Sequence, residues 1–143
     1  MELIDSILHV ETAQGPKEVK INTDDFSIDE ANLESELCKA GVLLCYYADL
    51  AAELDAKASN AKNRLREAEA VAAITLRSGG AKVTQGMVDD HLYTNTAVNA
   101  IRDSLVNTQK EASKASNLFK AMNQRVECLK ALAYRQGRQE KIF

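Results

Sequence analysis

Apolar residues recur along two long stretches of the chain at alternating spacings of four and three. In the first stretch the repeat occupies thirteen positions, here called the first seam: Leu33, Leu37, Ala40, Leu44, Tyr47, Ala51, Leu54, Ala58, Ala61, Leu65, Ala68, Ala72 and Thr75. This is a heptad repeat, the pattern of a helix that packs lengthwise against another helix. No proline interrupts it, so we expect one continuous helix over residues 28–77.

The residues before the first seam contain a signal for the start of a helix. Ser27 is followed three residues later by Glu30, which is the spacing of a capping box, and Phe26 stands where a hydrophobic staple is found. Acidic residues are frequent just after this point and would interact favourably with the positive end of the helix dipole. The pattern therefore places the helix start directly after Ser27.

The second heptad repeat lies near the C-terminus. Its positions, here called the second seam, are Val98, Ile101, Leu105, Thr108, Ala112, Ala115, Phe119, Met122, Val126, Leu129 and Ala133. Residues 78–82 (SGGAK) end the first helix, Thr84 can cap a short helix over 85–93, and Asn95 and Thr96 can cap the last helix over 97–138. Two long helices joined by a short segment should fold back as an antiparallel hairpin, and residues 137–143 should fray.

The N-terminal stretch has a different pattern. Residues 6–12 are rich in β-branched side chains, residues 13–16 (AQGP) are typical of a turn, and residues 17–22 alternate polar and apolar. This favours a small β-hairpin that must dock on something to be stable, with a short helix over 2–9 as the competing interpretation. We expect a mainly all-α protein with an N-terminal hairpin or extended segment over 1–26 and a helical hairpin domain over 27–143.

Further apolar residues lie off both seams: Val42, Leu43, Leu50, Val71, Leu118 and Leu132. A two-helix hairpin cannot bury both sides of its helices, so these partial stripes favour association between copies of the chain, a homo-oligomer. The alternative is that they pack against the N-terminal segment or within the hairpin.

Composition adds a charge asymmetry. The net charge of the 143 residues is −3, but residues 1–56 carry 13 acids and 3 bases, while residues 102–143 carry 9 bases and 4 acids. The two blocks can attract each other within a chain or between chains, or can be solvated helix faces. No apolar run is long enough to span a membrane, and the N-terminus has no basic region typical of a signal peptide. We expect a cytoplasmic protein with reduced cysteines and no membrane association.

No catalytic pattern is present in the sequence. The paired acids, such as Asp24-Asp25 and Asp89-Asp90, are explained by caps and surface positions, and Gly79-Gly80 ends a helix where a phosphate loop would open one. His9 and His91 are isolated, and the three cysteines form no metal-binding spacing. We therefore expect no enzyme, no catalytic residue, no metal site and no cofactor.

Basic residues are the remaining candidates for function. They are spread along the second half of the first helix, the loop after it and the last helix. Such rows can neutralise the phosphates of a nucleic acid, with an affinity that falls as salt rises. Tyr93, Phe119 and Tyr134 are candidates for stacking on bases, although Phe119 lies on a seam and should be core. The other interpretation is that these are ordinary surface charges.

Five segments resemble phage recombination mediator proteins of the UvsY type. They are residues 43–54 (LLCYYADLAAEL), 62–69 (KNRLREAE), 73–77 (AITLR), 83–88 (VTQGMV) and 129–135 (LKALAYR). The resemblance covers residues 28–138 and lies in the order of features: a long helix with a basic end, a glycine-containing break and a returning helix.

The resemblance implies a non-enzymatic protein that binds single-stranded DNA and serves DNA recombination and repair. Such a protein forms a ring-like homo-oligomer, displaces the single-strand-binding protein and helps to load a RecA-like recombinase, in the host cytoplasm if it is phage-encoded. The matching DNA-binding positions are Lys62, Arg64, Arg66, Arg77 and Lys82. The alternative is a helical oligomeric adaptor or assembly protein that binds another protein through its apolar stripes.

Overall fold

The computed structural model describes residues 7–12, 14–80 and 82–140. The elements are two strands, β1 (Ile7–Thr12) and β2 (Gly15–Lys20), two 3-10 helices, η1 (Thr23–Phe26) and η2 (Glu30–Asn32), and three α-helices, α1 (Leu33–Arg77), α2 (Gln85–Thr94) and α3 (Thr96–Glu140). The chain divides into two compact units. The first unit contains the residues up to Leu54 and from Ser113 onward, and the second unit contains Asp55–Ala112.

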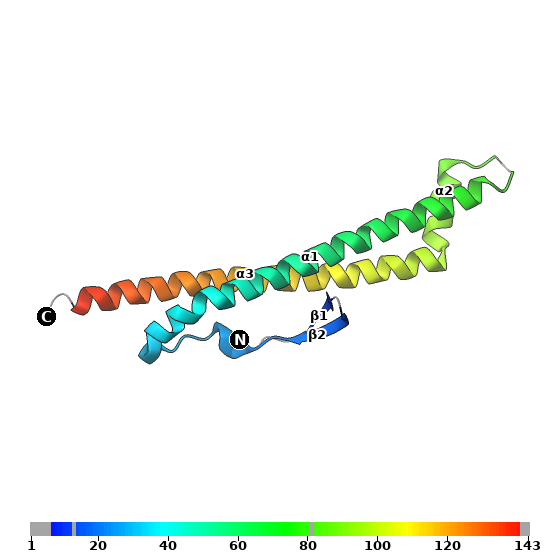
Figure 1. The fold of residues 1–143 in the computed structure, drawn as a ribbon. Coiled ribbons are helices and arrows are strands. Elements are labelled where there is room, and N and C mark those ends of the chain that lie inside the picture. The colour runs from blue at the N-terminus through cyan, green and yellow to red at the C-terminus, as the bar shows by residue number, and fades with distance from the viewer. Residues whose placement is uncertain (1–6, 13, 81, 141–143) are drawn as a thin grey trace. The chain divides into compact units, whose positions relative to one another are not determined.

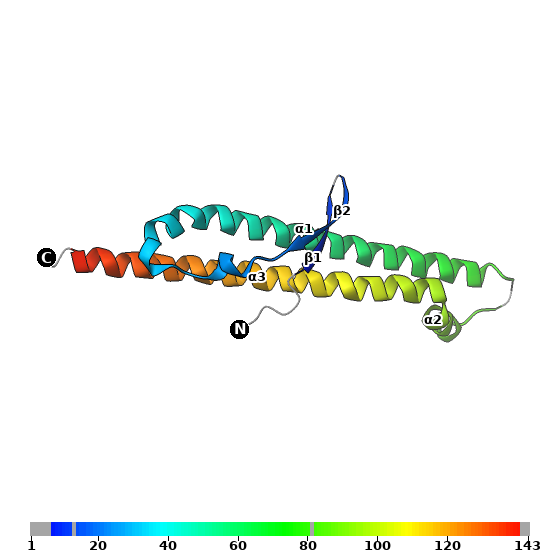
Figure 2. The same cartoon turned by 90° about the horizontal axis from the view of Figure 1, so that it is seen from below.

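In the first unit, the start of α1 lies beside the end of α3, so the two segments run antiparallel (Figures 1 and 2). Leu33 and Ala40 of α1 form a buried cluster with Leu129 of α3. Around this cluster pack half-buried side chains of the N-terminal segment and both helices: Ile28, Leu37, Val126, Leu132 and Ala133. This cluster gives the first unit an apolar core built mainly from the two seams.

The start of α1 differs from the prediction. The helix begins at Leu33 instead of residue 28, because polar side chains close two short 3-10 turns before it. Asp29 caps η2 by accepting a hydrogen bond from the Ala31 backbone N–H at 3.1 Å, and Ser27 ends η1 by donating its hydroxyl to the Asp24 carbonyl at 2.9 Å. The Ser27–Glu30 pair therefore does not form the cap that its spacing suggested, since short-range side-chain hydrogen bonds compete with the helix.

Hydrogen bonds, a ring contact and an ion pair hold the N-terminal segment between β2 and α1 against the two long helices of the first unit. The Tyr47 hydroxyl donates to the Asp25 carboxylate at 2.9 Å, and the Phe26 ring lies 4.9 Å from the Tyr47 ring, centre to centre. Phe26 thus packs against α1 far from the expected staple position. Arg125 of α3 donates from Nε to the Ser27 carbonyl at 3.1 Å and forms an ion pair with Glu36 through Nη2. This ion pair joins the acidic and basic blocks within one chain.

The N-terminal β-hairpin is confirmed. β1 and β2 are antiparallel, with His9 opposite Glu18 and Leu8 opposite Val19. The side chains of Leu8 and Val10 are buried while Ile7 is exposed, so one face of the hairpin is covered, as a stable two-stranded sheet requires. The proposed helix over 2–9 is wrong for residues 7–9, and its earlier part lies outside the described residues.

In the second unit, the end of α1 lies beside the start of α3, and α2 stands between them in sequence (Figures 1 and 2). Thr84 caps α2 by accepting from the Met87 N–H at 3.3 Å, and Asn95 caps α3 by accepting from the Val98 N–H at 3.1 Å, as predicted. Ala72, Val88, Val98, Leu105 and Thr108 are the buried side chains of this unit. An ion pair between Glu69 and Arg102 joins its two long helices at 3.6 Å.

The heptad seams coincide with the buried sides of the two long helices. Every position of the second seam and every position of the first seam except Thr75 is buried or half-buried. Thr75 is exposed and donates its hydroxyl to the Val71 carbonyl. Leu50, which lies off the first seam, is buried. It is therefore not available for association between copies of the chain. The predicted fraying from residue 137 is wrong as far as Glu140, where α3 ends; residues 141–143 lie outside the described residues.

Tyr47 gives the fold an expected sensitivity to alkali. Burial of the ring, its hydrogen bond to Asp25 and the charge of Asp25 raise the pKa of Tyr47 far above its ordinary value. In the unfolded chain a tyrosine ionises near pH 10, so above that pH the unfolded state binds one proton fewer than the folded state. The free energy of unfolding should then fall by up to about 1.4 kcal/mol per pH unit from this group.

The measurement is the urea midpoint of the protein and of Tyr47→Phe between pH 8 and pH 11. We expect the Tyr47→Phe variant to lose about 1 kcal/mol at pH 8, because its hydrogen bond to Asp25 is gone, and to show a shallower decline above pH 10. Tyr93→Phe is the control, since Tyr93 is 77% exposed. The same alkaline slope in Tyr47→Phe and the unaltered protein would contradict the assignment.

Candidate nucleic-acid interface

The five basic residues matched by the resemblance all lie in the second unit. Lys62, Arg64 and Arg66 belong to α1, Arg77 is its last residue, and Lys82 lies in the segment between α1 and α2. All five side chains are exposed. Each is therefore accessible to a ligand in solution.

The helix brings three of these residues to one side and turns one away. In a helix of 3.6 residues per turn, Lys62, Arg66 and Arg77 lie within about 60° of one another around the axis, whereas Arg64 is about 160° from Lys62. Lys62 and Arg66 are one turn apart, and Arg77 lies about 17 Å further along α1. The second unit thus presents a cationic row on one flank of α1, with Arg64 on the other flank.

The basic side chains of this region form few hydrogen bonds or ion pairs within the protein. Within the part of the chain that the structure describes, no hydrogen bond or ion pair engages the side chains of Lys62, Arg64, Arg66 or Lys82. Arg77 differs, because its Nη2 donates to Gln85 Oε1 at 3.2 Å, and Gln85 in turn donates to Asp89 at 3.0 Å. A neutral amide leaves the charge of Arg77 uncompensated, so it too remains available to an anion.

Exposed apolar side chains accompany the cations on α1. Val71 and Ile74 are 64% and 66% exposed, one turn apart, between Arg66 and Arg77. Val71 is one of the off-seam residues named above, whereas Ile74 is not among them. The signal was present, since Ile74 follows the seam residue Ala72 by two positions and therefore cannot face the same side. Around the helix axis Val71 lies about 20° from Arg64, and Ile74 lies about 60° from Arg77. Val71 therefore belongs to the Arg64 flank, while Ile74 borders the cationic row.

The three aromatic candidates have different environments. Tyr93, in α2, is 77% exposed and belongs to the second unit with the basic row. Tyr134, in α3, is 69% exposed and belongs to the first unit. Phe119 is half-buried on the second seam, as expected of a core residue. Of these three candidates, the two tyrosines expose their rings to solvent and Phe119 does not.

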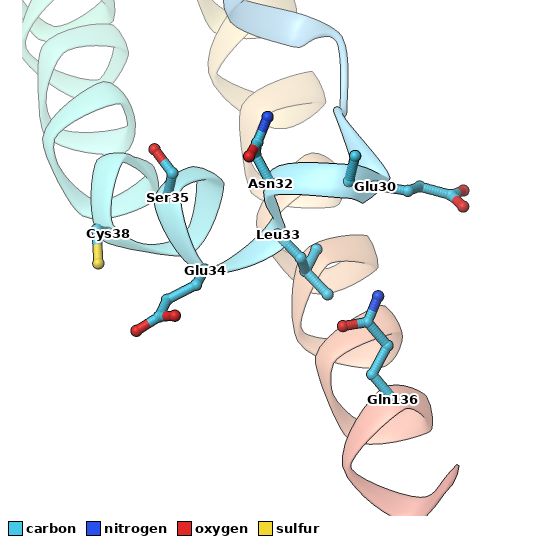
Figure 3. Close-up of a pocket in the computed structure, with 8 residues that line it drawn as sticks. Glu30, Asn32, Leu33, Glu34, Ser35, Cys38 and Gln136 are labelled. Carbon is cyan, nitrogen blue, oxygen red and sulfur yellow. The ribbon is translucent and has the colours of Figure 1, made fainter. Parts of the chain in front are cut away.

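A depression of about 680 Å³ lies in the first unit, at the start of α1 (Figure 3). Its lining is Glu30, Ala31, Asn32, Leu33, Glu34, Ser35, Cys38 and Gln136. Cys38 is an exposed thiol, and this lining contains no histidine that could activate it. Among the described residues, no group of three or more His, Cys, Asp or Glu side chains is arranged to hold a metal ion.

No family model matches the sequence, and neither a curated protein nor a solved structure matches it. Among the described residues, no helix has both the length and the apolar character to cross a membrane.

Proposed function

We propose that this protein is a non-enzymatic recombination mediator that binds single-stranded DNA and assists the loading of a RecA-like recombinase. The observation that carries the proposal is the exposed row of Lys62, Arg66 and Arg77 on one flank of α1, with Lys82 in the following segment. These residues occupy the positions where the resemblance to UvsY-type mediators locates DNA binding. The wider assignments, including a homo-oligomer, a single-strand-binding protein and a recombinase as partners, rest on that resemblance.

The chemistry of the row suits a polyanion. The lysine and arginine side chains present charge that the described residues do not neutralise, and counterion release from phosphates favours binding at low salt. The contribution of one chain is small, because only four or five charges are involved. Several copies on one strand would raise the overall affinity by avidity, which is why an oligomer belongs to the proposal.

The test is a fluorescence-anisotropy titration of a labelled single-stranded oligonucleotide with the protein and with Arg64→Gln/Arg66→Gln/Arg77→Gln. We expect binding at low salt that weakens steeply as salt rises, and at least a tenfold rise in Kd for the triple variant. Each phosphate contact removed should reduce the slope of log K against log salt by about 0.7. Arg64, on the opposite flank, should contribute least when the three residues are changed singly.

A charge-matched control separates a local site from general electrostatics. Lys17→Gln/Lys20→Gln/Lys39→Gln removes the same charge from the acidic N-terminal block, where all three lysines are exposed. We expect the control to bind nearly as the unaltered protein does. Equal loss in both triple variants, or no anisotropy change for the unaltered protein at micromolar concentration and low salt, would reject the DNA-binding proposal.

A helical adaptor is the second candidate, and the exposed apolar residues favour it. Val71 and Ile74 of α1 are 64% and 66% exposed and three residues apart, which is the spacing of two anchor residues on a helix that docks in a partner's groove. A stoichiometric protein complex that forms without DNA and is lost in Val71→Ser/Ile74→Ser would support the adaptor over the mediator.

A further inference from the structure

The outward side of the last part of α3 carries a tyrosine between two cations. Lys130, Tyr134 and Arg138 are spaced four residues apart, so they form one row along the helix. Tyr134 is 69% exposed, and the guanidinium carbon of Arg138 lies 5.8 Å from the centre of its ring. Arg135 is exposed beside the row, and residues 128–139 contain no acid. This row, with Arg135, is here called the Tyr134 row.

The Tyr134 row points away from the nearest block of acids. Gln136 shares the lining of the depression with Glu30 and Glu34, which places those carboxylates on the Gln136 side of α3 (Figure 3). Tyr134 and Arg138 are each about 160° around the helix from Gln136. The ion pair of Lys130 with Glu127, at 3.0 Å, is between side chains that are both more than 60% exposed, so it is easily exchanged for a ligand.

We propose that the Tyr134 row is a second contact for single-stranded nucleic acid, separate from the row on α1. The Tyr134 ring would stack on a base, while Lys130, Arg135 and Arg138 would neutralise phosphates on either side of it. Lys130 and Arg138 are about 12 Å apart along α3, the length of three to four stacked nucleotides. The class of ligand, single-stranded nucleic acid, is taken from the proposed function. The residues of this second contact lie in the first unit, whereas the row on α1 lies in the second.

The chemistry favours a nucleic acid over a lipid surface. A helix that lies on a membrane presents a row of large apolar side chains beside its cations. Here the apolar side chains next to Tyr134 are small or turned inward, since Ala131 is exposed and Leu132 packs against the core cluster. A single exposed ring with cations on both sides of it along the helix is instead the arrangement in which a base stacks on the ring while the cations bind phosphates.

The test is photo-crosslinking of the full-length protein to an oligonucleotide that contains 5-iodouracil, followed by mass spectrometry of the peptides. We expect a crosslink at Tyr134. We also expect a five- to tenfold rise in Kd for Tyr134→Leu, little change for Tyr134→Phe, and a fall of about 1.4 in the salt slope for Arg135→Gln/Arg138→Gln. Lys17→Gln/Lys39→Gln is the charge-matched control, and far-UV circular dichroism checks that each variant folds.

The outcomes distinguish this inference from the proposed function. If Arg64→Gln/Arg66→Gln/Arg77→Gln weakens binding while Tyr134→Leu does not and no crosslink forms at Tyr134, the Tyr134 row is no DNA contact and the mediator proposal remains. If the unaltered protein binds no oligonucleotide at low salt, both are overturned. Binding to vesicles that contain phosphatidylserine is measured as a further arm of the test. If Tyr134→Leu and Arg138→Gln abolish vesicle binding but leave oligonucleotide binding unchanged, the row binds a lipid surface and the inference is overturned.

Discussion

Replacing Leu129 by alanine should destabilise the first unit by about 2–5 kcal/mol. Leu129 is fully buried in a cluster with Leu33 and Ala40 of α1. The expected cost is the lost transfer free energy of the removed carbons plus the cavity that they leave. Ala40 is small and Leu33 is already buried in the same cluster, so α1 can fill the space only by shifting side chains that are packed elsewhere. Urea and thermal denaturation, followed by far-UV circular dichroism, would show the change as a fall in Tm of roughly 5–15 °C.

The matched control for Leu129→Ala is Val42→Ala. Val42 is 73% exposed on α1, so its truncation removes few contacts and should alter the free energy of unfolding by no more than about 0.5 kcal/mol. A Leu129→Ala variant as stable as Val42→Ala would mean that the cluster around Leu129 does not form in solution. That result would remove the support for the pairing of α1 with α3 in the first unit.

The elements governed by periodic burial could be predicted from the sequence. The heptad spacing of the two seams identified both long helices and nearly every inward position, because a helix must turn its apolar stripe toward its partner. Caps such as Thr84 and Asn95 were also predictable, since a side-chain oxygen at that position satisfies a free backbone N–H. The β-branched residues 6–12, the turn residues 13–16 and the alternation of residues 17–22 together favoured the hairpin over a short helix.

Features that depend on competing local hydrogen bonds, or on contacts between distant residues, could not be predicted. The start of α1 was misplaced because Asp29 and Ser27 offered local hydrogen bonds that compete with a helix, and nothing in the spacing ranks these alternatives. Arg125 is one of the basic residues of the last helix, and nothing in its spacing separates it from the exposed ones. Its burial depends on a contact with Ser27, which is 98 residues away in the sequence. The separation of Arg64 from Lys62 and Arg66, in contrast, follows from helix geometry alone.

Replacing Arg125 by methionine should destabilise the first unit by about 3–5 kcal/mol, the range found when one partner of a buried ion pair is removed. The Arg125 side chain is 4% exposed, and that of Glu36 is 18% exposed. Without the guanidinium, the Glu36 carboxylate and the Ser27 carbonyl both lose a donor in a partly buried site. The N-terminal segment would also lose its attachment to α3. Denaturation in urea gives the change in the free energy of unfolding, and limited proteolysis around Ser27 reports the release of the segment.

A second variant separates the buried charge from the packing. In Arg125→Met/Glu36→Leu no charge is left unpaired, and Arg125 Nη1, which is buried without a hydrogen-bond partner among the described residues, is also gone. We expect the double variant to be more stable than Arg125→Met, because apolar replacement of both partners avoids the desolvation penalty. Lys120→Met, an exposed change on the same helix, is the control and should be nearly neutral. If Arg125→Met behaves as Lys120→Met does, the ion pair contributes no more than a surface contact, and other contacts, such as those of Asp25, Phe26 and Ile28, hold the N-terminal segment.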